Sequence, residues 1–246
     1  MELHLRFDDN KARKLKYNLV AAREQGHDTL ATYGGAFSNH IRATAIAGQA
    51  HGFKTVGIIR GEEHLPLNPV LRTAVEHGMR LSYLDRSAYR RKEIPDDLGP
   101  CYLLPEGGSN ELAVRGCAEL GAQIDGFDVV AVPVATGGTL AGLAAGLEHG
   151  LALGFSVLKG GDFLTGRVAE LQRRTYGEVR GSWRIETGFH CGGYARTTPE
   201  LLDFIADFEA CQGIRLDPHY TGKMVYGLFR MGFPSGTRVC AVITTG

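Results

Sequence analysis

The stretch that decides the fold is VVAVPVATGGTL, residues Val129–Leu140. Its first six residues, Val129–Val134, form a continuous apolar run, which is typical of a parallel strand covered on both faces. The paired glycines Gly137 and Gly138 then mark a turn, and the small and apolar residues of 139–149 predict a helix. Exposed N–H groups at a strand–glycine–helix turn attract anions, so a phosphate is the expected ligand.

Strands and helices alternate in the same way along most of the chain. Apolar runs predict strands at 29–33, 54–59, 79–84, 101–104, 128–134, 155–158 and 182–186, and helical spacing predicts helices at 11–25, 41–50, 67–77, 109–123 and 139–149. This alternation predicts an α/β fold with parallel sheets. The strand at 182–186 alternates polar and apolar residues and is expected near a sheet edge. The polar stretch 85–100 is expected to form a surface loop or short helix.

Composition excludes several classes of protein. The chain has 246 residues and a mass of 26.6 kDa, enough for one large domain or two smaller ones. Its 27 Lys and Arg residues balance 27 Asp and Glu residues, so a nucleic-acid partner has no electrostatic support. No run of 18 apolar residues indicates a membrane span. The five cysteines form no Cys-x-x-Cys pair, which gives no support for a metal site and favours a reducing cytoplasm.

A lysine opens the first predicted helix in an unusual setting. Lys11 is followed by Arg13, Lys14 and Lys16, so four cations crowd a helix N-terminus that favours anions. Such crowding favours the neutral form of a lysine, which is the nucleophilic form. The alternative for Lys11 is an ordinary surface lysine.

Two further segments carry polar groups at the start of a predicted helix. In GGAFSNH, residues 34–40, Ser38 is expected to cap the helix and, with Asn39, to form a cradle for a carboxylate or phenolate oxygen. The alternative is a capping serine beside a packing histidine, His40. In DPHYTGK, residues 217–223, Tyr220 offers a phenol and Thr221 a hydroxyl, although either one could simply cap the helix.

Together these motifs resemble the fold-type II pyridoxal phosphate (PLP) enzymes, in particular the group of 1-aminocyclopropane-1-carboxylate (ACC) deaminase and D-cysteine desulfhydrase. The resemblance spans nearly the whole chain. The matching segments are Asn10–Leu15, Ser38–His40, the phosphate loop Thr136–Thr139, Gly192–Ala195 and Asp217–Lys223. By contrast, neither a Walker loop nor a Gly-x-Gly-x-x-Gly fingerprint is present, which disfavours ATP and NAD.

The resemblance implies a fold, a cofactor and a set of site residues. The fold is a two-domain tryptophan-synthase-β-like fold, with a larger PLP-binding domain (1–13 and 125–246) and a smaller α/β domain (14–124). Lys11 forms the Schiff base with PLP and Asn39 bonds the ring oxygen. The remaining cofactor-binding residues are Thr136, Gly137, Gly138, Thr139, Thr221 and Thr245. The catalytic residues are Lys11, Ser38 and Tyr220, and the substrate-binding residues are Ser38, Asn39, His40 and Tyr194.

Position 221 distinguishes the two activities. The deaminases have a glutamate after the tyrosine that keeps the pyridine nitrogen protonated, whereas Thr221 is neutral. We therefore expect β-elimination from D-cysteine, a small amino-acid substrate, to give pyruvate, sulfide and ammonia. The alternatives are an ACC deaminase, a synthase that performs β-replacement, and a non-catalytic PLP-binding relative in which a shortened link before Lys11 and a short C-terminus misplace the site. A cytoplasmic homodimer is also implied.

Overall fold

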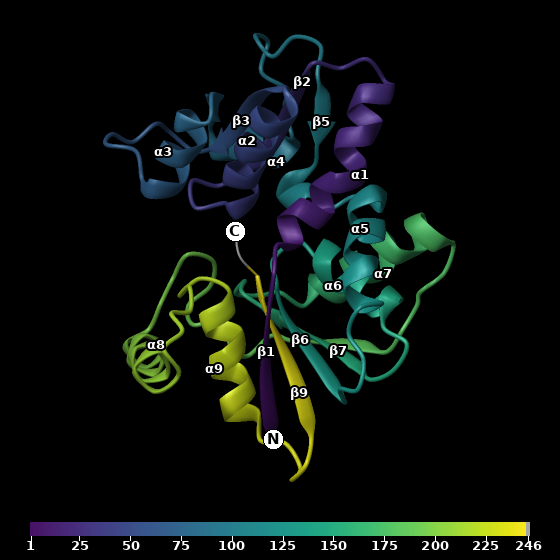
Figure 1. Cartoon of the computed structure of the whole chain (residues 1–246). Coiled ribbons are helices and arrows are strands. Elements are labelled where there is room, and N and C mark those ends of the chain that lie inside the picture. The colour runs from purple at the N-terminus through teal and green to yellow at the C-terminus, as the bar shows by residue number, and fades with distance from the viewer. Residues whose placement is uncertain (245–246) are drawn as a thin grey trace. The chain divides into compact units, whose positions relative to one another are not determined.

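The computed structural model describes residues 1–244 (Figure 1). Its strands are β1 (Glu2–Asp8), β2 (Thr29–Gly34), β3 (Lys54–Arg60), β4 (Met79–Leu84), β5 (Tyr102–Leu104), β6 (Val129–Val134), β7 (Leu151–Ser156), β8 (Trp183–Glu186) and β9 (Arg238–Thr244). Its helices are α1 (Asn10–Glu24), α2 (Asn39–His51), α3 (Pro69–Glu76), α4 (Arg86–Arg91), the short η1 (Glu106–Gly108), α5 (Glu111–Gly121), α6 (Gly138–Gly146), α7 (Phe163–Tyr176), α8 (Pro199–Gln212) and α9 (Thr221–Met231).

The chain packs as two compact units, each with its own sheet. Unit 1 comprises Met1–Asn10 and the described part of the chain from Cys117 onward, and unit 2 comprises Lys11–Gly116. These are packing units. The functional domains, 1–13 with 125–246 and 14–124, stay a proposal.

Unit 1 contains a five-stranded sheet in the order β1-β9-β6-β7-β8, with every pair parallel. The first and last strands lie side by side, Glu2 opposite Arg238 and Asp8 opposite Thr244 (purple and yellow in Figure 1). The apolar run Val129–Val134 is the inner strand β6, as predicted, and β8 lies at an edge, as predicted. The strand predicted at 155–158 was placed too late, because β7 already begins at Leu151, directly after the left-handed Gly150.

Helices cover both faces of this sheet. One face packs against α8 and α9, in a core that includes Val129, Ala131, Leu153, Phe155, Leu201, Met224 and Val225. The opposite face carries α6, since Gly154 lies against Leu140. The helix predicted at 139–149 ends earlier, at Gly146, because Leu147 has an extended backbone.

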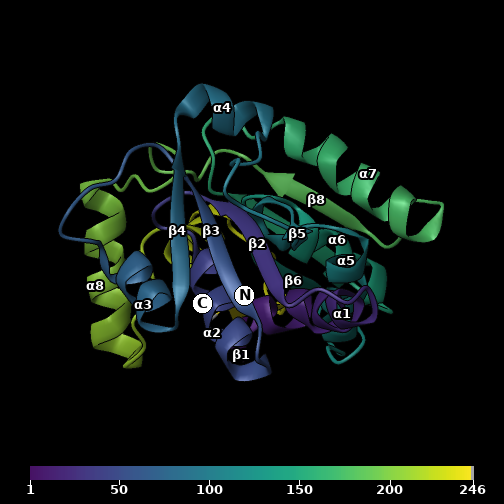
Figure 2. The ribbon, with the colours of Figure 1, turned by 90° about the horizontal axis from the view of Figure 1, so that it is seen from above.

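Unit 2 contains a four-stranded parallel sheet in the order β4-β3-β2-β5 (Figure 2). Helices α2 and α3 cover one face through Ile41, Ala45, Ile59, Leu71 and Met79, whereas Tyr89 of α4 packs with Ala31, Tyr33, Val56 and Ile58. The polar stretch 85–100 contains the short helix α4, as predicted. Because both sheets are parallel and flanked by helices, the predicted α/β class is confirmed.

Candidate active site

In unit 1, predicted site residues gather where parallel strands end. Strand β1 ends at Asp8 and leads to Asn10, and β6 ends at Val134 and leads to the glycine loop 136–139. Asn10 Nδ2 donates a hydrogen bond to Thr139 Oγ1 over 2.9 Å, and both residues are buried. Because Lys11 directly follows Asn10, this bond ties the chain to the glycine loop one residue before the lysine.

The glycine loop has the geometry of an anion site. Gly137 is left-handed, with φ +84°, and a Cβ built on it would come within 3.0 Å of Val168 Cγ2. Gly138 is the first residue of α6. The first N–H groups of a helix have no partner within it and carry the positive end of its dipole. The loop therefore presents backbone donors that suit an anion, and a side chain at position 137 would press against Val168.

At the start of α9, Asp217 organises the second group of predicted residues. Its Oδ1 accepts hydrogen bonds from the backbone N–H groups of His219 and Tyr220, and its Oδ2 accepts one from that of Thr221. Tyr220 occupies the N-cap position of this helix, but its side chain makes no capping hydrogen bond. The carboxylate of Asp217 accepts from the backbone N–H groups at the helix start instead, and the Thr221 hydroxyl donates to that carboxylate rather than capping the helix.

The side chains of Tyr220 and Thr221 make hydrogen bonds of their own. Tyr220 Oη donates to Tyr194 Oη over 3.3 Å, with the two rings edge to face. The buried Thr221 donates its hydroxyl proton to Asp217 Oδ2 over 3.0 Å, so toward any other group this hydroxyl is an acceptor. The predicted Thr245 lies outside the described residues.

In unit 2, the predicted residues Ser38, Asn39 and His40 open α2 after strand β2. Ser38 caps the helix, as predicted: its Oγ accepts a hydrogen bond from Ile41 N–H over 3.4 Å. A Cβ on Gly34 would come within 2.9 Å of Ser38 Oγ, so only glycine allows the strand to approach this closely. Asn39 is the first residue of the helix and is partly exposed.

His40 is the most unusual polar residue of this group. Its side chain is 2% exposed, and among the described residues neither ring nitrogen has a hydrogen-bond partner. Burial lowers the pKa of His40 well below its usual value, and the charges of Lys14 and Lys11 act in the same direction. The ring lies against Gly108, which follows the neighbouring strand β5. His40 is therefore a neutral imidazole whose two buried ring nitrogens have no partner among the described residues, an arrangement that calls for an explanation.

We expect the stability of the protein to fall below about pH 6.5, the usual pKa of a histidine. In that range the unfolded chain binds a proton at position 40 that the folded chain excludes, so unfolding becomes more favourable by up to about 1.4 kcal/mol per pH unit. Urea unfolding at pH 7.5 and 5.5 measures this loss. It should shrink in His40→Gln and persist in His149→Gln, which replaces an exposed histidine. An equal loss in His40→Gln would contradict the assignment.

Comparisons with known proteins decide the family. The sequence model of the family described as "Pyridoxal-phosphate dependent enzyme" matches residues 7–245. The chain belongs to this family. A putative ACC deaminase from Thermotoga maritima is 32% identical and matches over 96% of this chain and 83% of its own length. D-cysteine desulfhydrase from Salmonella choleraesuis is 28% identical, over 92% of this chain and 80% of its own.

A solved structure supports the same assignment. The crystal structure of an ACC deaminase homologue has a TM-score of 0.82 to this chain at 27% identity, over 96% of this chain and 79% of that one. The resemblance inferred from the motifs is therefore confirmed. The protein is a PLP-dependent enzyme of the ACC deaminase and D-cysteine desulfhydrase type. The residues present suit PLP, because the glycine loop provides the anion cradle that its phosphate requires.

The sequence did not single out three residues of this PLP-dependent enzyme. Lys14 is buried, and its Nζ donates to Gly107 O over 2.9 Å and to Ser109 Oγ over 3.1 Å. Its spacing from Lys11, three positions along a helix, signals a shared face. Asp217 and Lys223 lie inside the matched motif, but nothing in their spacing revealed the contacts that they make.

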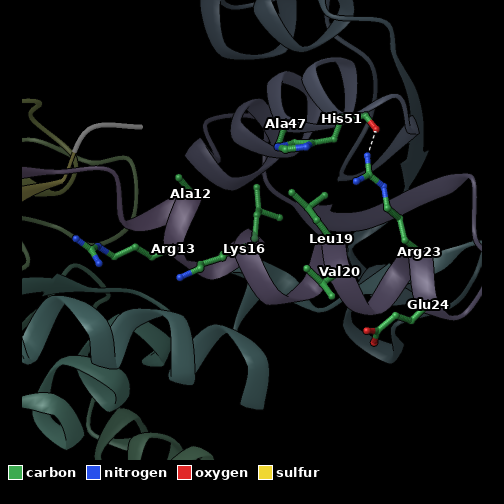
Figure 3. Close-up of a pocket in the computed structure, with 10 residues that line it drawn as sticks. Ala12, Arg13, Lys16, Leu19, Val20, Arg23, Glu24, Ala47 and His51 are labelled. Carbon is green, nitrogen blue, oxygen red and sulfur yellow. Dashed lines mark hydrogen bonds between the residues drawn. The ribbon is translucent and has the colours of Figure 1, made fainter.

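Residues 1–244 carry no membrane-spanning helix and no metal cluster. No helix there is long and apolar enough to cross a membrane, and no group of three His, Cys, Asp or Glu side chains is placed to hold a metal ion. A groove of about 630 Å³ in unit 2 is lined by α1, from Ala12 to Glu24, and by Ala47 and His51 of α2 (Figure 3). None of the predicted site residues lines this groove, and Arg23 within it donates to the backbone oxygen of His51.

Proposed function

We propose that this enzyme is a lyase that catalyses β-elimination from D-cysteine, releasing pyruvate, sulfide and ammonia. The observation that carries the choice of substrate is at position 221. Thr221 is neutral, where the deaminases of the resembled group have a glutamate. A neutral hydroxyl does not hold a proton on the pyridine nitrogen as a carboxylate does. The electron sink is then weaker, which suits the departure of a good leaving group more than the opening of a cyclopropane ring.

The site residues divide between holding the cofactor and holding the substrate. Lys11 binds PLP through its ε-amino group, residues 136–139 hold the phosphate, and Asn39 bonds the ring oxygen. Ser38, the N–H groups at the start of α2 and neutral His40 bind the carboxylate of the substrate. When bound, PLP supplies an electron sink for the α-carbon of an amino acid.

Two side chains then move protons. The amine of Lys11, which would hold PLP at rest, would take the α-proton of the bound substrate. In the enzyme without substrate, Tyr220 directs its phenolic proton to the Tyr194 phenol. With substrate bound, the Tyr220 proton turns to the sulfur as the carbon–sulfur bond breaks, while Tyr194 keeps the Tyr220 oxygen in place. Water then completes the hydrolysis to pyruvate and ammonia.

The alternative of a non-catalytic relative is disfavoured by the link before Lys11. Although this link is only Asp9-Asn10 after strand β1, Asn10 reaches Thr139 over 2.9 Å. The second candidate function is ACC deaminase, the activity named for the putative Thermotoga relative.

We expect the purified protein loaded with PLP to release pyruvate and sulfide from D-cysteine at a rate at least tenfold above that of ACC turnover, a difference of about 1.4 kcal/mol in activation free energy. Pyruvate, sulfide and 2-oxobutyrate are assayed in parallel with D-cysteine, L-cysteine and ACC. Turnover of ACC without sulfide release would overturn the proposal. A new amino acid formed when a second thiol is supplied would instead assign β-replacement.

The assembly and location of the enzyme rest on the resemblance alone. We propose a homodimer that works in the cytoplasm on a small amino acid. The five cysteines, none of them paired in the described part of the chain, agree with a reducing compartment.

A further inference from the structure

Lys223 is a charged residue in the core of unit 1. It lies on α9, directly before the buried apolar residues Met224 and Val225, and is itself 0% exposed. Its Nζ donates to the backbone oxygen of Gly193 over 2.7 Å. Burial lowers the pKa of Lys223, while the groups of Cys191 and Asp217 act in the opposite direction. Burying a lysine side chain costs folding free energy, so the hydrogen bond of Lys223 to one backbone carbonyl requires an explanation.

The carbonyl that Lys223 contacts belongs to a strained turn. Residues 191–195 contain four positive φ angles, +47° at Cys191, +90° at Gly192, +107° at Gly193 and +55° at Ala195. Cys191 and Ala195 are not glycines, and each such residue costs energy that the surroundings must supply. Gly193 O also accepts from Arg196 N–H over 3.1 Å, so this oxygen is the point at which the turn is held.

Tyr194 follows directly after that carbonyl. Its phenol accepts the hydrogen bond from Tyr220, the N-cap residue of α9, three positions before Lys223. The start of α9 therefore holds the turn at two points, through Lys223 on Gly193 and through Tyr220 on Tyr194. The two points are adjacent in the turn, so a shift of Gly193 moves the Tyr194 phenol.

We propose that Lys223 is a positioning residue, whose buried amine holds the 191–195 turn so that the Tyr194 phenol orients Tyr220 for proton transfer to the leaving group. The catalytic part of this inference rests on the proposed function. Lys223 itself touches neither substrate nor cofactor. Lys223 acts on the reaction indirectly, by holding the Gly193 carbonyl and, through it, the pair of Tyr194 and Tyr220. A shift of about 1 Å in the position of such a pair is enough to slow a reaction markedly.

The test of coupling is a double-mutant cycle with Lys223→Met, Tyr194→Phe and the double variant. Lys223→Met keeps an unbranched side chain one atom shorter and removes the donor. We expect it to lower kcat about tenfold or more with KM changed less than twofold, because the contact acts on the proton-transfer step. In the Tyr194→Phe background, which lacks the orienting phenol, the same change should lower kcat less than twofold. Equal losses in both backgrounds would overturn the proposal.

A second measurement does not depend on the reaction. Hydrogen exchange followed by mass spectrometry should show faster exchange of peptides covering 189–196 in Lys223→Met, with the peptides of β6 and α6 unchanged. Lys223→Gln, which keeps an N–H donor without the charge, should lie between Lys223→Met and the wild type. Lys54→Met removes an exposed lysine of unit 2 and should change neither kcat nor exchange. Unchanged exchange at 189–196 in Lys223→Met would overturn the proposal, whatever the substrate of the enzyme is. Faster exchange in Lys223→Met, together with a wild-type protein that does not turn over D-cysteine, would refute only the proposed function.

Discussion

Lys11→Ala should lose both the visible absorbance of bound PLP and all turnover of the substrate. The reason is that one ε-amino group performs two tasks in the proposed site, holding the cofactor and moving the α-proton. Loss of a residue with both tasks removes catalysis rather than weakening it, so we expect kcat to fall by a factor on the order of 10⁴. Absorbance spectra of the purified protein and a pyruvate assay measure the two effects separately.

The matched control for this variant is Lys16→Ala. Lys16 lies on the same helix but is exposed, with its Nζ over the ring of Tyr17. It should keep the visible band and nearly the wild-type rate. A Lys11→Ala protein that retained the band, or a Lys16→Ala protein that lost it, would show that another lysine carries the cofactor.

Gly137→Ala should weaken PLP binding by about tenfold or more without unfolding the protein. The backbone at this position is left-handed, which costs an alanine about 1–2 kcal/mol. The new Cβ would also lie 3.0 Å from Val168, so the loop must shift and its N–H groups no longer converge. Each 1.4 kcal/mol lost from binding is a factor of ten in affinity. Titration of the apoprotein with PLP, followed by absorbance, measures the change.

Gly166→Ala is the matched control for the loop variant. Gly166 lies inside α7, and a Cβ built on it meets no atom within 4 Å. Alanine there should leave PLP affinity unchanged and stabilise the helix by about 0.4–1 kcal/mol. Equal affinity of Gly137→Ala and the wild type for PLP would mean that the phosphate binds elsewhere.

The sequence predicted several parts of the fold whose signal is local, although β9, α7 and α8 were not among the predicted elements. The continuous apolar run of Val129–Val134 indicated an inner strand, and Ser38 before an apolar helix indicated a cap. Strand β1 was not among the predicted strands, because Glu2–Asp8 mixes polar and apolar residues at a sheet edge, where only one neighbour constrains them. The end of α6 at Gly146 also escaped prediction, since Gly146 lies too close to Ala118 of α5 for a side chain.

The candidate site shows the same division between local and distant information. Motif matching located Lys11, Ser38 and the glycine loop. It did not reveal that Thr221 gives its proton to Asp217, or that Lys223 reaches Gly193, because the second contact joins positions 30 residues apart. Lysine side chains are rarely buried, so the sequence alone predicts that Lys223 lies at the surface. The Thr221–Asp217 contact joins residues only four positions apart, but the motif does not say which group accepts the hydroxyl proton, so both contacts had to come from the structure.

Chemical trapping tests most directly whether Lys11 carries the cofactor. The protein loaded with PLP is reduced with borohydride, digested and mapped by mass spectrometry. We expect a single pyridoxyl adduct, on the peptide that contains Lys11. An adduct on Lys14 or Lys223 in its place, or no adduct on any lysine, would contradict this expectation.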